Sequence, residues 1–183
     1  MTTRERMDLF RREIEPFLPE YCMMTDVCGW LKARGFFDAP ASTRYHGAQP
    51  GGLFDHSLCV TRQLILMTER NGLKWQRKES PHVVGFFHDL CKVDQYRQVV
   101  REDGETAYAF NSSTLLRGHG DKSVMLLAQL MPLTEEEVAC IRYHMGAFTD
   151  RELWNDYTQA VKRFETVLWT HTADMLATHV FDT

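Results

Sequence analysis

Six side chains of only two types, histidine and aspartate, are the residues of this sequence best suited to chemistry. They are His56, His88, Asp89, His119, His144 and Asp174. Four neutral imidazoles and two carboxylates form a mixed nitrogen and oxygen ligand set, suited to one or two divalent ions of the Mn, Fe, Co, Ni or Zn type. Their separations fit no short motif, so spacing alone is weak evidence for a metal site.

His88 and Asp89 are neighbours inside a strongly apolar segment, residues 86–91, which reads Phe-Phe-His-Asp-Leu-Cys. A carboxylate buried in such surroundings is costly unless a partner charge or a metal compensates it. A buried hydrogen bond between the two side chains at a helix end would also satisfy this requirement. These two residues alone favour that structural interpretation, and the other His and Asp residues shift the balance toward a metal site.

Helices are the elements that we expect to bring these distant residues together, as in the core of a helical bundle. Apolar residues recur at helical spacing in several segments, which are residues 3–18, 20–34, 54–69, 124–130, 150–162 and 165–180. Ser80-Pro81 predicts another helix start, with Ser80 as the N-cap, and Thr134 to Glu137 fits a capping box.

One β-hairpin is the only strand signal, because residues 96–101 and 105–110 are β-prone and flank Asp103-Gly104. The expected fold class is therefore all-α, a helical bundle with one small β-hairpin. We expect a single domain overall, in which the N-terminal helices of residues 1–36 pack on the larger unit of residues 37–183.

Composition and charge argue against several classes of function. A formal net charge of -4 does not favour a surface that coats nucleic acid. Five cysteines with no Cys-x-x-Cys pattern indicate reduced thiols rather than a disulfide framework or a zinc ribbon. The N-terminus lacks the apolar segment of a signal peptide, and no apolar run approaches the ~20 residues that span a bilayer. We expect a cytoplasmic protein with no membrane partner.

Five short segments resemble the HD-domain metal-dependent phosphohydrolase superfamily. They are residues 51–57 (GGLFDHS), 87–92 (FHDLCK), 118–123 (GHGDKS), 143–146 (YHMG) and 173–175 (ADM). Together they match the ordered H…HD…H…H…D ligand series of the six-ligand, two-metal branch, over roughly residues 40–180. The resemblance implies that residues 37–183 form an HD domain, a helical bundle built around a metal site.

The resemblance also implies a division of the ligands between two divalent ions, for which Mg is a further candidate. The first ion would be held by His56, His88, Asp89 and Asp174. The second would be held by His119 and His144, with Asp89 bridging the two. Two such ions about 3.5 to 4 Å apart can activate a bridging hydroxide and stabilise the charge that develops on a phosphoryl group.

Lys92 matches the lysine that frequently follows the His-Asp pair in this superfamily, which implies that it binds the scissile phosphate as a point charge. Asp89 and Lys92 are thus the expected catalytic residues. Arg44 and His46 are candidate substrate contacts, because residues 45–48 (YHGA) resemble the loop before the first ligand in exoribonuclease-like members. Lys122 could also reach a phosphate, although a solvated helix surface explains it as well.

The function that we expect is hydrolysis of a phosphate mono- or diester of a nucleotide or short oligonucleotide. Exoribonuclease-like members carry an added nucleic-acid-binding domain, and these 183 residues leave no room for one, so polymeric RNA is disfavoured. A di-iron oxygenase and a nucleotide-binding sensor or interaction module without turnover are the alternatives. The amphipathic N-terminal helices also suggest a homodimer.

Overall fold

The protein is mostly helical, with one antiparallel hairpin, as the sequence predicted. The structure is a computed structural model that describes residues 1–45 and 47–181. Its α-helices are α1 (Thr3–Glu13), α2 (Val27–Ala33), α3 (Gly52–Asn71), α4 (Ser80–Phe87), α5 (Gly120–Leu127), α6 (Glu135–Tyr143), α7 (Trp154–Arg163) and α8 (Thr166–His179). Short 3-10 turns separate several of them, among them η3 (Leu90–Val93), which follows α4.

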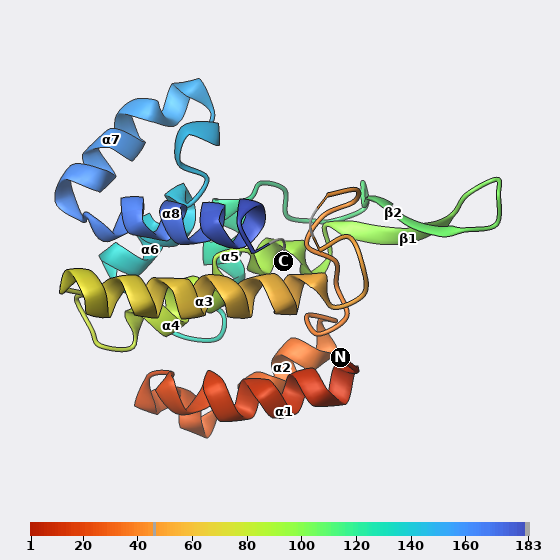
Figure 1. The fold of residues 1–183 in the computed structure, drawn as a ribbon, viewed down its shortest axis with the longest axis horizontal. Helices are drawn as coiled ribbons and strands as arrows, with labels where there is room; N and C mark the ends of the chain where they lie inside the picture. The colour runs from red at the N-terminus through yellow and green to blue at the C-terminus, as the bar shows by residue number, and fades with distance from the viewer. Residues whose placement is uncertain (46, 182–183) are drawn as a thin grey trace.

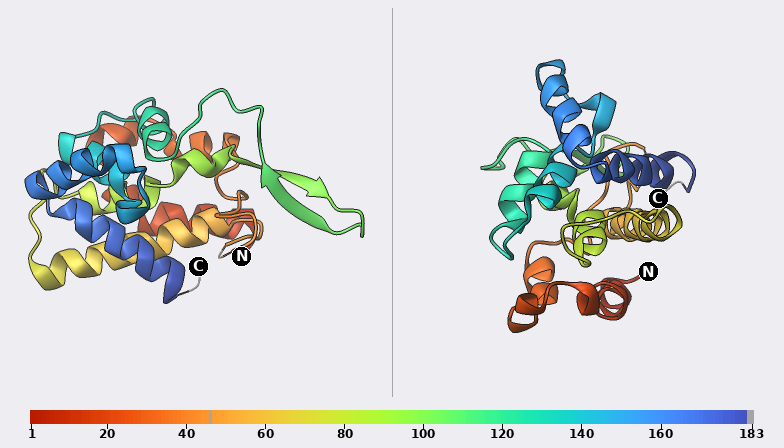
Figure 2. Two further views of the ribbon diagram at one scale, coloured as in Figure 1. Left: turned by 90° about the horizontal axis from the view of Figure 1, so that it is seen from above. Right: turned by 90° about the vertical axis from the view of Figure 1, so that its left-hand side faces the viewer.

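The long helix α3 lies at the centre, with α4 and α8 packed against it (Figure 1). Helix α6 packs in turn against α8 and α5. The hairpin, β1 (Tyr96–Val100) and β2 (Thr106–Phe110), projects away from the helices on one side (Figure 2). It pairs Tyr96 with Phe110 and Val100 with Thr106 around the predicted turn at Asp103-Gly104. The helices therefore build the body, and the hairpin extends from it.

A cluster of aromatic rings joins the N-terminal helices to this body. Phe10 of α1 has its ring centroid 5.3 Å from that of Phe86 in α4 and 6.0 Å from that of Phe37. All three side chains are fully buried and belong to one hydrophobic core that extends to Ala177 in α8. Buried Arg6 adds an ion pair with Asp55, 3.2 Å from Nη2 to Oδ2. The division of the chain at residue 36 stays a prediction.

Two helix boundaries near the N-terminus differ from the prediction. Helix α1 ends at Glu13 rather than near residue 18, because Pro16 lies inside the predicted helix and cannot donate a helical N–H. The single helix predicted over residues 20–34 is wrong in its first half, which is the 3-10 turn η2 (Glu20–Met24). Helix α2 begins only at Val27, where the Asp26 carboxylate accepts a 2.8 Å hydrogen bond from the Gly29 N–H.

Ser80 is the first residue of α4 rather than its N-cap, a position that Glu79 takes. Its hydroxyl instead donates a 2.8 Å hydrogen bond to the carboxylate of Glu137 at the start of α6. The capping box that Thr134 and Glu137 were predicted to form is confirmed. One glutamate thus caps its own helix and ties that helix to α4.

Gly85 allows α3 and α4 to approach closely, since a Cβ atom there would lie 2.6 Å from the Cα of Thr61. We expect Gly85→Ala to lower the free energy of unfolding by about 1–3 kcal/mol, because the contact is with backbone and the helices must separate. Urea denaturation measures this loss. Gly104→Ala is the control, because no atom lies within 4 Å of its Cβ position and only the backbone at φ 83° is strained. A Gly85→Ala protein as stable as the parent would show that the helices tolerate a wider spacing.

Candidate metal centre

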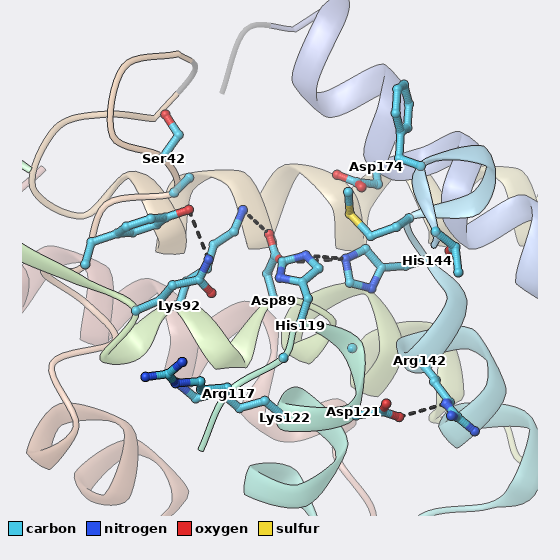
Figure 3. Close-up of a pocket in the computed structure, with 18 of the residues that line it drawn as sticks. Ser42, Asp89, Lys92, Arg117, His119, Asp121, Lys122, Arg142, His144 and Asp174 are labelled. Atoms are coloured by element: carbon cyan, nitrogen blue, oxygen red, sulfur yellow. Dashed lines mark hydrogen bonds and ion pairs between the residues drawn. The ribbon is translucent and has the colours of Figure 1, made fainter. Parts of the chain in front are cut away.

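All six predicted ligand residues converge in the interior of the bundle. Figure 3 shows the four of them that reach the cavity, Asp89, His119, His144 and Asp174. They come from the ends and faces of five elements: His56 from α3, His88 and Asp89 from the end of α4, His119 from the start of α5, His144 from the end of α6 and Asp174 from α8. The other residues of these elements build the core, so packing of the helices sets the positions of the ligands.

The first group of side chains surrounds one oxygen of Asp89. His56 Nε2 lies 3.1 Å from Asp174 Oδ1 and 3.8 Å from Asp89 Oδ2. His88 Nε2 lies 3.5 Å from the same Asp89 oxygen and 3.9 Å from Asp174 Oδ1. Two imidazoles and two carboxylates therefore present their donor atoms to one another across a few ångströms.

The second group surrounds the other oxygen of the same carboxylate. Asp89 Oδ1 lies 3.0 Å from His119 Nε2 and 3.5 Å from His144 Nε2, and the two imidazole nitrogens are 3.1 Å apart. Each oxygen of Asp89 thus faces a different pair of histidines. This is the arrangement that a carboxylate bridging two ions would need.

The imidazole rings are oriented by their second nitrogen atoms. The Nδ1–H of His88 donates to the Gly85 carbonyl at 2.9 Å, and that of His144 donates to the Ile141 carbonyl at 2.7 Å. When such a ring is neutral, its lone pair then lies on Nε2 and points into the cluster, as in histidines that bind metals.

The Nε2 atom of His88 gives the clearest test of whether a metal fits. This atom is buried and has no hydrogen-bond partner in the part of the chain that the structure describes. Burial lowers the pKa of His88 to about 3, so the ring stays neutral over the ordinary pH range. A buried, neutral nitrogen without a protein partner is what a divalent ion would satisfy.

Asp89 carries the charge at the centre of the cluster. Burial alone would raise the pKa of Asp89, but Lys92, His88 and His119 outweigh burial and hold that pKa well below its usual range. Lys92 Nζ lies 2.6 Å from Asp89 Oδ2. Burial alone would lower the pKa of Lys92, whereas the Asp89 carboxylate raises it above its usual range. Carboxylate and ammonium are therefore both charged at neutral pH.

The cluster opens into a cavity of about 1490 Å³. Asp89, Lys92, His119, His144 and Asp174 line its wall. His56 and His88 lie beneath this surface, with side chains at most 1% exposed. A molecule bound in the cavity would therefore lie next to Lys92 and the Asp89 carboxylate. His56 and His88 lie on the buried side of the cluster.

The candidate substrate contacts outside the cluster are placed differently from one another. Lys122 lines the cavity, but its ammonium is bound to the Asp94 carboxylate and lies 3.1 Å from Thr114 Oγ1. Arg44 is exposed and is not among the residues of the cavity wall. His46 lies outside the described residues. The substrate roles of these three residues stay predictions.

Cys91 is a neighbour of the cluster that the sequence did not single out, because the number and spacing of the cysteines indicated only reduced thiols. Its Sγ lies 3.1 Å from His119 Nδ1. Burial raises the pKa of Cys91 to about 12, so it stays a thiol and orients the His119 ring. His171 of α8 donates its Nδ1–H to the His144 carbonyl at 2.8 Å.

Comparison of the chain with protein-family models, with curated proteins and with solved structures finds no match. Among the described residues, no helix combines the length and apolar character needed to cross a membrane. The described residues thus form a mostly helical protein with a His- and Asp-rich cluster that could bind metal ions.

Proposed function

We propose that the protein is a metal-dependent phosphohydrolase of the HD type, which cleaves a phosphate mono- or diester of a nucleotide or short oligonucleotide. The observation that carries this proposal is the position of the Asp89 carboxylate. One of its oxygens faces His56 and His88, the other faces His119 and His144. The ammonium of Lys92 completes this arrangement at the cavity wall.

Two divalent ions fit the donor set, which has no thiolate and suits Mn, Fe, Co, Ni or Zn, with Mg as a further candidate. One would be held by His56, His88, Asp89 and Asp174, and the other by His119, His144 and Asp89. When bound there, such ions lower the pKa of water and neutralise charge on a phosphoryl group.

The residues of the chain would bind and orient the ester. Lys92 stays protonated beside Asp89 and lies at the cavity wall, where its ammonium can attract a phosphate oxygen. The backbone carbonyls of Gly85 and Ile141 keep the Nδ1 protons of His88 and His144 in place, so neither ring has to change tautomer. The cavity exceeds the usual ~300–1,000 Å³ of small-molecule sites and has room for a nucleotide.

Lys92→Met is expected to keep the divalent metal content while lowering kcat/KM for phosphate esters about 10²–10³-fold, the usual cost of removing one group that stabilises transition-state charge. The measurement loads purified protein with Mn, Co or Ni, determines metal content, and follows phosphate release from nucleotides, cyclic nucleotides and short oligonucleotides. Lys122→Met is the matched comparison, since this lysine also lines the cavity but is bound to Asp94. A larger loss in Lys122→Met would reverse the assignment, and a parent protein without divalent metal would refute the proposal.

A di-iron oxygenase remains the alternative with the same ligand set, and Lys92 favours the hydrolase because an ammonium recognises an anionic ester. Phosphate release under anaerobic conditions would support hydrolysis, whereas iron content with oxygen uptake would support oxidation. A binding module without turnover is the third hypothesis. Tight nucleotide binding with no product in the presence of several metals would favour it.

A further inference from the structure

Two aromatic side chains at the base of the hairpin form part of the cavity wall. Tyr96 opens β1 and is paired in register with Phe110, the last residue of β2. Residues directly opposite in an antiparallel pair share a face, and these two rings meet edge to face with centroids 5.3 Å apart. Neither ring belongs to the hydrophobic core, and Phe110 is 68% exposed. This pair of aromatic rings therefore lines the cavity and is not covered by the hydrophobic core.

The short connection along the chain keeps this aromatic wall close to Lys92, the lysine proposed to bind the phosphate. Lys92 lies in η3, and β1 begins four residues later at Tyr96. Asn111, which follows β2, donates a 2.9 Å hydrogen bond from its side chain to the Asp94 carbonyl between them. The position of the hairpin base relative to Lys92 is thus fixed on both strands, and the hairpin beyond it extends away from the helices (Figure 2).

Gln95 places a hydrogen-bonding group beside the two rings. Its side chain lines the cavity, and its amide nitrogen donates to the Tyr96 hydroxyl at 3.4 Å. Its amide oxygen is buried and has no hydrogen-bond partner among the residues that the structure describes. An amide can accept a hydrogen bond from an exocyclic amine on the edge of a base, as Gln does when proteins recognise adenine. Ring face, amide and ammonium thus match the face of a nucleobase, its hydrogen-bonding edge and the phosphate of a nucleotide.

We propose that Tyr96, Phe110 and Gln95 bind the nucleobase of the substrate, with the base against the aromatic wall and its phosphate at Lys92. The inference rests on the proposed function and restricts its substrate to esters that carry a planar base.

The test compares kcat/KM for adenosine 5′-monophosphate and cytidine 5′-monophosphate with kcat/KM for ribose 5-phosphate, which has the same phosphate without a base. In Phe110→Ala we expect the ratio of nucleotide to ribose phosphate to fall about 10- to 100-fold, as for removal of one stacking aromatic. Phe110→Tyr should restore the ratio because the ring is retained. Gln95→Ala should lower the ratio for both nucleotides, because adenine and cytosine each carry an exocyclic amine.

Phe148→Ala is the matched control, because Phe148 also lines the cavity and is 67% exposed, but it follows α6 rather than belonging to the hairpin. A fall in the ratio for Phe148→Ala with none for Phe110→Ala would overturn the proposal.

Failure of the proposed function gives a different result from failure of this inference. If no phosphate ester is hydrolysed, the phosphohydrolase proposal fails, and calorimetric binding of adenosine to the parent and to Phe110→Ala still tests the aromatic wall. If all esters are hydrolysed with equal losses in Phe110→Ala, the hydrolase proposal stands and the base-binding wall is refuted.

Discussion

Asp89→Ala is expected to lose divalent metal from both halves of the cluster and to lower kcat/KM for phosphate esters by at least about 10³-fold, more than the removal of one charge-stabilising group. The reason is geometric, since each oxygen of this carboxylate faces a different pair of histidines. Metal analysis and dissociation constants for Mn, measured by calorimetry, check the result together with the rate.

His144→Ala is the comparison, because His144 Nε2 lies beside Asp89 Oδ1 and His119 Nε2 and its loss should mainly weaken one ion. Equal loss of metal in both variants would contradict the bridging role of Asp89. Asp89→Ala also leaves the Lys92 ammonium buried without its partner, which destabilises a protein. The double variant Asp89→Ala with Lys92→Met removes both charges, so it should fold and still lack both ions, which keeps the test decisive.

Glu137→Ala is expected to lower the free energy of unfolding by about 3 kcal/mol, as when one partner of a buried ion pair is removed. Its side chain is fully buried, and Oε1 lies 2.7 Å from Arg77 Nε and 2.8 Å from Ser80 Oγ. The other oxygen accepts the Thr134 N–H at 2.9 Å and closes the capping box. The truncation therefore leaves a mostly buried guanidinium unpaired and frees the start of α6. Chemical denaturation of metal-free protein measures the loss.

Glu135→Ala is the matched control in the same helix. Its carboxylate is 67% exposed and pairs with Arg163, which is 66% exposed, so its removal should cost no more than about 1 kcal/mol. Equal effects of the two substitutions would show that the buried network around Glu137 contributes nothing beyond a surface ion pair.

Local signals in the sequence predicted those elements whose causes are themselves local. The hairpin follows from two β-prone segments around Asp103-Gly104, and the start of α6 follows from the capping box of Thr134 and Glu137. Where a local signal met a competing one, the prediction was wrong. Pro16 ends α1 inside a continuous apolar pattern, and Ser80 bonds to Glu137 instead of capping its own helix.

The sequence by itself determined that the protein is mainly helical with one hairpin, and it identified the side chains able to bind a metal by their types. Only the tertiary structure decided which of them meet. His56 and Asp174 come from helices that pack together far apart in the chain, and Nε2 and Oδ1 lie 3.1 Å apart because α3 and α8 share a core. Likewise, Lys122 is held by Asp94, 28 residues away in the chain, although it is close to a predicted ligand. Pairing of charges depends on distances between helices, and those distances are set by packing that no local pattern records.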